Sequence, residues 1–110
     1  MPYNEELDDM LQEVINDCPG LVRKKMFGGT GYLINGNMSF GVYKDFLVLR
    51  VGEEGAGKLK KESYYHPFDI TGRPMKGWVM IDESGWKNAK ELRRLVTMAR
   101  EYVLALPKKK

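Results

Sequence analysis

Asn35-Gly36 lies between two segments in which apolar residues alternate with small or polar ones, and this feature restricts the fold of the 110-residue chain most. Both residues readily adopt the positive φ angles that a two-residue type I′ hairpin turn requires. Residues 32–34 and 38–43 are therefore predicted to pair as antiparallel strands. Lys44-Asp45 marks a second tight turn, which leads into a predicted strand over 46–51. These consecutive strands form an antiparallel meander.

Further strands are predicted on both sides of the meander. A strand over 22–27 precedes it, and the glycines of the segment 28–31 are expected to allow a bulge or a close backbone approach. After the meander, the glycine- and lysine-rich segment indicates a short helix over about 54–61. Two more strands are expected at 67–70 and 75–81. The sheet would then have about five strands, built from hairpins.

Helical spacing of apolar residues appears near both ends of the chain. A helix is predicted over 4–18, with Asn4 as its N-cap and Pro19-Gly20 at its end. A long helix is predicted over 84–105, and Asp82 or Ser84 can cap it.

The apolar face of this long helix is wide, so it must be buried against the sheet or against a second subunit. The sequence therefore predicts an α+β fold, in which an N-terminal helix, an antiparallel sheet and a short middle helix are followed by a long C-terminal helix packed on the sheet. Residues 1–110 are expected to form a single domain with a basic tail at 107–110. The wide helix face also suggests a homodimer.

The composition is typical of a soluble globular domain, with 43% hydrophobic and 30% charged residues. Apolar runs are much shorter than the roughly 18 residues that a membrane span needs. The N-terminus is acidic and lacks the apolar region of a secretory signal. Cys18 is the single cysteine, so an internal disulfide cannot form. We therefore expect a cytoplasmic protein that does not contact membranes.

The charge is distributed unevenly, although the net value is only +3. Residues 1–18 contain six acidic and no basic residues, whereas residues 85–110 contain eight basic and two acidic ones. Two solvated helix faces that attract each other would explain this pattern. The alternative is a basic helix that binds nucleic acid through Lys87, Lys90 and Arg94. We expect such binding to be weak and non-specific, because few phosphates could be contacted at once.

No motif in the sequence predicts catalysis, a metal site or a cofactor. The segment 52–58 matches the body of a phosphate-binding P-loop, but Leu59 occupies the position where Ser or Thr must hold the metal. His66 is the only histidine, and no local signature pairs it with a nucleophile such as Ser39, Ser63 or Ser84. Cys18 lies on the apolar stripe of the first helix and is expected to be a small core residue.

Two segments are candidates for contact with a small ligand. Arg73 and Lys76 flank a turn that is rich in backbone N–H groups, which would suit a small anion. The glycine cluster 28–31 could let a ligand approach the backbone closely. An aromatic stretch over 64–68 and Trp78 lie near the same two bases, and rings interleaved with bases can also stack on nucleic acid.

The sequence resembles the N-terminal domain of the TfoX/Sxy family, the regulators of natural competence, and in particular a branch of small stand-alone proteins. The resemblance covers about residues 5–106 and rests on KMFGGTGY at 25–32, NGNM at 35–38, HPFD at 66–69 and GRPMKGW at 72–78. The motif residues taken as structural are Met26, Phe27, Gly28, Gly29, Gly31, Asn35 and Gly36.

This resemblance implies an α+β fold and, loosely, a regulatory role without catalytic residues. We therefore expect a non-enzymatic regulatory or interaction module that acts by binding a macromolecule, with another protein as the expected partner. The alternatives are a nucleic-acid-binding protein that uses the basic C-terminal helix, and a small-ligand or anion binder near 28–31 or 73–76.

Overall fold

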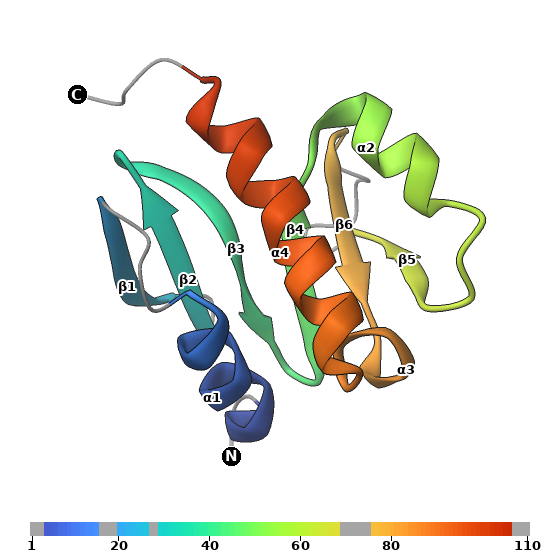
Figure 1. Cartoon of the computed structure of the whole chain (residues 1–110), viewed down its shortest axis with the longest axis horizontal. Coiled ribbons are helices and arrows are strands. Elements are labelled where there is room, and N and C mark those ends of the chain that lie inside the picture. Colours follow the sequence, from blue (N-terminus) through green and yellow to red (C-terminus); the bar gives the residue numbers. More distant parts are fainter. Residues whose placement is uncertain (1–3, 16–19, 27–28, 69–75, 107–110) are drawn as a thin grey trace.

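The computed structural model describes residues 4–15, 20–26, 29–68 and 76–106, and it has the predicted α+β architecture. Its sheet contains six antiparallel strands in the order β1-β2-β3-β4-β6-β5 (Figure 1). The strands are β1 (Leu21–Met26), β2 (Gly29–Ile34), β3 (Asn37–Tyr43), β4 (Phe46–Arg50), β5 (Tyr65–Pro67) and β6 (Trp78–Ile81).

The meander has the turn that the sequence predicted. Asn35 and Gly36 have φ angles of 53° and 84°, as a type I′ turn requires, and they join β2 to β3. The second tight turn is also confirmed, because Tyr43 pairs directly with Phe46 across Lys44-Asp45. Among the described residues, the irregularity in the pairing of β2 with β3 is between Tyr32 and Leu33, after the predicted glycine segment.

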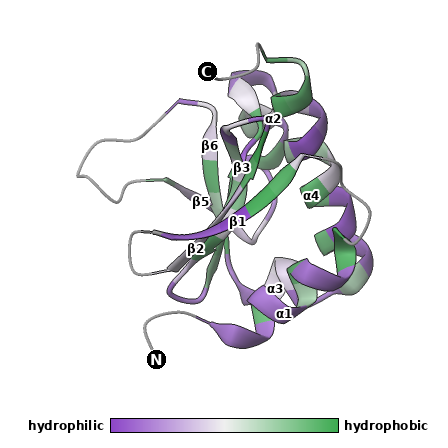
Figure 2. Cartoon of the chain, turned by 90° about the vertical axis from the view of Figure 1, so that its left-hand side faces the viewer, coloured by the Kyte–Doolittle hydropathy of each residue, from purple (hydrophilic) through white to green (hydrophobic). Residues whose placement is uncertain are grey.

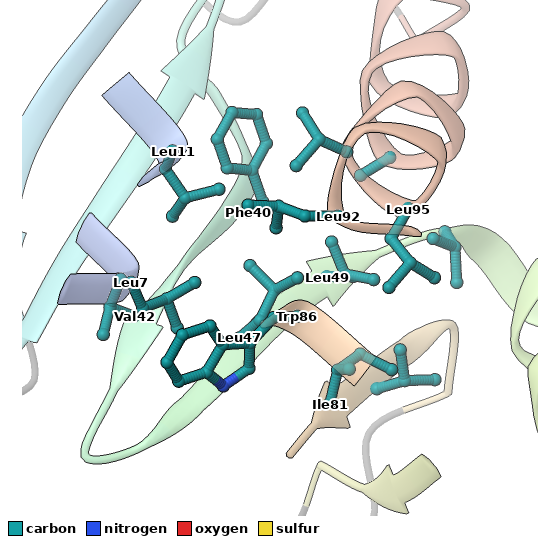
Figure 3. Packing of buried hydrophobic residues seen from close by; sticks show 14 of the residues in the cluster. Leu7, Leu11, Phe40, Val42, Leu47, Leu49, Ile81, Trp86, Leu92 and Leu95 are labelled. Carbon is teal, nitrogen blue, oxygen red and sulfur yellow. The ribbon is translucent and has the colours of Figure 1, made fainter. Parts of the chain in front are cut away.

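The helices of the described residues lie on one face of the sheet (Figure 2). They are α1 (Glu5–Val14), α2 (Gly52–Leu59), α3 (Glu83–Trp86) and α4 (Ala89–Leu104). Their apolar side chains meet those of the sheet in one core, in which Trp86, Leu47 and Leu92 are fully buried (Figure 3).

The predicted C-terminal helix is interrupted, so the prediction of one helix over 84–105 was wrong. The chain leaves α3 after Trp86 and enters α4 at Ala89, with Lys87 as the C-cap of α3. Asn88 then caps α4 by accepting a hydrogen bond from the backbone N–H of Glu91. Asp82 caps α3 in the same way, through the backbone N–H of Ser84. Apolar spacing alone did not reveal this break, because Trp86 is buried whether the segment forms one continuous helix or two separate ones.

The middle helix begins earlier than the predicted 54–61. It starts at Gly52, whose φ of +79° lets the chain turn out of β4 into α2. The P-loop-like segment 52–58 is therefore helical and does not form a phosphate-binding loop. Within the described residues the nearby strands differ from those predicted at 67–70 and 75–81: β5 ends at Pro67 and β6 begins at Trp78. Residues 69–70 and 75 lie outside the described residues.

The apolar face of α4 is covered within one chain. Leu92, Leu95, Val96, Ala99 and Val103 are all buried by the sheet and its neighbouring helices. The wide helix face that suggested a homodimer is thus covered by other elements of the same chain. It gives no support to dimerisation, which stays a prediction.

A buried carboxylate joins α1 to the sheet. Asp8 accepts hydrogen bonds from the Arg23 guanidinium at 2.5 Å, from the Tyr32 hydroxyl at 2.5 Å and from the Thr30 hydroxyl at 3.1 Å. Burial alone would raise the pKa of Asp8, but these three donors outweigh it and hold the pKa below its ordinary value. The same burial, together with the nearby carboxylate, raises the pKa of Tyr32.

The hairpin turn gives a direct test of the fold. We predict that Gly36→Val destabilises the domain by about 1–3 kcal/mol, because valine is strained at positive φ. Gly57→Ala should instead raise the free energy of unfolding, since Gly57 lies inside α2 and an added Cβ would meet no atom within 4 Å. It should stabilise by about 0.5–1 kcal/mol. Chemical denaturation measures both, and equal stability of Gly36→Val and wild type would contradict the turn.

The Asp8 cluster predicts a pH dependence of stability. A carboxyl with a lowered pKa in the folded state stabilises above its unfolded pKa of about 3.9 and loses this contribution as pH falls through the folded value. Asp8→Asn should cost roughly 1.5–3 kcal/mol at pH 7. The deficit should shrink as the pH is lowered from 5 to 2.

The matched control is Asp9→Asn on the exposed side of the same helix. This change should alter the free energy of unfolding by less than about 0.5 kcal/mol. A deficit for Asp8→Asn that stays constant with pH would show that the cluster does not act through the charge of Asp8.

Candidate binding surface

The second face of the sheet carries no helix of the described residues (Figure 2). Successive side chains of a strand point to opposite faces, so the residues between the core positions of β4 and β6 point away from the helices. Register then places these neighbours together: Gly41 beside Val48, Val48 beside Met80, and Arg50 beside Trp78. We call this second face the open face.

Aromatic side chains form two clusters on the open face. The rings of Phe46 and His66 meet edge to face, with centroids 5.2 Å apart. At the other end of β4, the ring centroids of Phe68 and Trp78 are 5.5 Å apart, and the Arg50 guanidinium lies 5.5 Å from the Trp78 ring. All five side chains are half-buried. In each cluster, part of the ring surface is therefore packed within the protein, and part remains accessible to a partner.

The region between the two clusters is closed and flat. Val48 and Met80 are only 2% and 7% exposed there. Gly31 and Gly41 are paired beside them and leave the sheet without side chains at these positions. A Cβ on Gly41 would lie 2.2 Å from the Thr30 carbonyl oxygen, so glycine is required by close backbone contact between strands.

His66 and Asp82 form a polar pair at the edge of this face. His66 Nε2 lies 2.8 Å from the Asp82 carboxylate, which also accepts hydrogen bonds from the backbone N–H and hydroxyl of Ser84. Burial alone would raise the pKa of Asp82, but the bonds from Ser84 and His66 lower it overall.

This geometry does not make a nucleophile–base pair. A catalytic serine must donate to histidine, whereas Ser84 donates to the aspartate. Ser39, another serine considered from the sequence, is fully buried, and no described group forms a hydrogen bond with its Oγ.

The basic residues predicted to contact phosphates are largely engaged within the protein. Arg94 binds both oxygens of Glu91 at 2.7 and 3.0 Å and also reaches the Tyr64 hydroxyl at 3.1 Å. Hydrogen bonds from Arg94 and Tyr64 lower the pKa of Glu91 to about 2, while burial and Glu91 raise the pKa of Tyr64 to about 12. Lys87 lies 3.7 Å from Glu83. Of the three predicted contacts, only Lys90 is an exposed base without a described ion pair.

Other residues proposed from the sequence are dispersed by the fold. Gly29 and Gly31 lie within β2 and Met26 ends β1, so the glycine cluster belongs to the sheet. A Cβ on Gly29 would lie 1.9 Å from the Val42 carbonyl oxygen, which confirms a close backbone approach, although to a strand. Phe27, Gly28 and Arg73 lie outside the described residues, as do Cys18 and the tail at 107–110.

Lys76 lines a pocket of about 260 Å³ between α2 and the adjacent ends of β5 and β6. The pocket has aromatic and apolar walls with two lysines and one glutamate. Its residues are Glu53, Ala56, Gly57, Lys60, Tyr65, Pro67, Phe68, Lys76, Gly77 and Trp78. Phe68 and Trp78 also belong to the open face, so the pocket adjoins that face at its β5–β6 end.

Sequence reasoning had noted Trp78 and the stretch 64–68 but not Arg50, Tyr43 or Phe46. Alternation within the predicted strand 46–51 was the signal that could have found two of them. Leu47 and Leu49 share one face of that strand, so Phe46 and Arg50 point to the opposite face.

The TfoX N-terminal domain family model matches residues 13–102, which is most of the chain. The chain belongs to this family. No curated protein sequence matches the chain significantly. Among the described residues of this TfoX N-terminal domain, no helix is long and apolar enough to cross a membrane. The same residues contain no group of three or more His, Cys, Asp or Glu side chains that could hold a metal ion.

The engagement of Arg94 by Glu91 and Tyr64 predicts weak binding to duplex DNA, because the remaining exposed bases of α4 could contact only a few phosphates at once. At physiological salt we expect dissociation constants near the non-specific range of about 10⁻⁴–10⁻⁶ M. The double change Lys90→Glu and Arg93→Glu affects two exposed bases of α4 and should weaken even this binding. Gel-shift titration provides the measurement. A nanomolar complex that survives competitor DNA and depends on these two residues would contradict the prediction.

Proposed function

We propose that this TfoX N-terminal domain is a regulatory interaction module, competence-like in role, that acts by binding another protein through the open face of its sheet. The observation that supports this most is the group of half-exposed aromatic side chains on a face without a described helix. Exposed apolar surface of this kind is typical of an interaction site.

The chemistry of the open face suits a protein partner. Aromatic and arginine side chains are enriched at the energetically important centres of protein interfaces. Arg50 and Trp78 provide such a pair, in which the guanidinium is already oriented against the ring. The rigid strands fix both side chains, so little conformational freedom would be lost on binding.

The charges around the open face favour a partner with acidic groups. Lys24 is exposed on β1 and its register partner is Gly31, which places it on this face. Lys44 lies over the Tyr43 ring at 5.4 Å, and Arg50 adds a third cation. The Asp82 carboxylate at the edge of this face is engaged by His66 and Ser84. Electrostatic complementarity would guide an acidic partner to this face.

Capture of partners on the immobilised domain tests this function. The open-face variant carries Val22→Glu and Tyr43→Glu. Val22 lies on the open face because the next residue, Arg23, reaches Asp8 on the helix side, and successive strand residues point to opposite faces. Leu104→Glu is the matched control, because Val22 and Leu104 are both 50% exposed but Leu104 lies on α4. Circular dichroism verifies that all forms fold.

We expect a protein from an extract of the source organism to bind wild type and Leu104→Glu equally and to bind the open-face variant at least several-fold less. Treating the extract with nuclease should not change the capture. Equal capture by the open-face variant would contradict the assigned face. Loss of capture after nuclease would favour nucleic acid as the partner.

A further inference from the structure

The pocket between α2 and the β5–β6 end combines ring surfaces with exposed cations. Tyr65, Phe68 and Trp78 line the space, and each is half-buried. Lys60 follows α2 and Lys76 precedes β6, and both are exposed. This geometry points to a binding site for a nucleotide, with the base against the rings and the phosphate near the lysines.

The rings account for the base. Aromatic side chains hold nucleobases by stacking, and this contact tolerates different bases because every base has a π face. Phe68 and Trp78 are inclined by 42° with centroids 5.5 Å apart, so they form an angled wall and not a closed stack. A volume of about 260 Å³ is below the range of pockets for drug-sized ligands, and it suits a planar base better than a large cofactor.

The lysines account for the phosphate. Lys76 is paired with Glu53 at 3.9 Å, but their side chains are 88% and 73% exposed. Such a long, solvated ion pair contributes little, so Lys76 can turn to a phosphate at small cost. Lys60 adds a second cation from another element. Among the described residues the lining carries two lysines and one glutamate, so a phosphate is favoured over an uncharged group.

Gly57 supplies an independent observation. Glycine inside a helix is unfavourable, so a structural reason is expected for each one. Gly52 needs its positive φ, and Gly55 packs against the Val51 side chain. Gly57 has neither reason, because an added Cβ would meet nothing within 4 Å. It lines the pocket, where the absence of a side chain keeps the space open for a ligand.

Calorimetric titration of the whole chain tests the site with defined probes. AMP and GMP represent free nucleotides, and a short single-stranded oligonucleotide represents the same chemistry within a strand. Adenosine, inorganic phosphate and phenylacetate separate the contributions of base, phosphate and a general aromatic anion. Tryptophan fluorescence locates binding, because Trp86 is fully buried and Trp78 lines the pocket.

Matched variants separate the pocket from the rest of the surface. Gly57→Leu should fill the space and weaken nucleotide binding by about tenfold or more, whereas Gly57→Ala should change it less than about twofold. Lys76→Gln should weaken AMP but not adenosine. Lys58→Gln is the control, because Lys58 lies on α2 and pairs with Glu54 outside the pocket. If Gly57→Leu fails to fold, the double change Lys60→Gln and Lys76→Gln replaces it.

The titrations distinguish a free nucleotide, a nucleic-acid strand and the absence of a nucleotide site. Binding of AMP or GMP that follows this variant pattern supports a free nucleotide, and binding of the oligonucleotide alone supports a nucleic-acid strand as its source. The site is overturned if neither probe binds at about millimolar concentration, or if the pocket variants leave affinity unchanged. Equal affinity for phenylacetate would also overturn it. Val22→Glu and Tyr43→Glu lie outside the pocket lining and should leave nucleotide binding unchanged, so the two proposals can fail separately.

Discussion

Trp86 is fully buried between sheet and helices, and its indole Nε1–H donates to the Asp45 carbonyl oxygen at 2.9 Å. This side chain fixes α3 against the β3–β4 turn and directs α4 across the sheet (Figure 1). The apolar residues of β4 and β6 are buried beneath these helices. Because the helices occupy one face, the other face is left to the half-exposed rings. Both proposed binding regions depend on this one-sided packing.

The same packing determines which charged side chains lie close enough to pair. The acidic first helix is attached to the sheet through Asp8, whose carboxylate is balanced by Arg23 and two hydroxyl donors. On the basic final segment, Arg94 is held by Glu91. The Arg94–Glu91 pair lies within α4, and no ion pair among the described residues joins α1 to α4, so the interpretation of mutually attracting helix faces stays a prediction. Cations remain exposed on the sheet and around the pocket, and Lys90 and Arg93 remain exposed on α4.

The limits of prediction follow from particular residues. Asn35-Gly36 and Lys44-Asp45 were identified because tight turns depend on local φ preferences, which neighbouring sequence alone largely sets. The break at Lys87 and Asn88 was missed because both helices present apolar residues to the same core. An asparagine can lie within a helix or cap one, and its capping bond to Glu91 becomes evident only in the fold.

The sequence by itself determined the α+β class, the meander and the family, since turns and apolar periodicity are local properties that survive without knowledge of distant contacts. Tertiary structure alone decided which charges are paired and which rings lie together. Phe46 meets His66, and Arg50 meets Trp78, across strands that are far apart in the chain. Such neighbours are set by strand order and register, and a different strand order or a one-residue shift would replace every one of them.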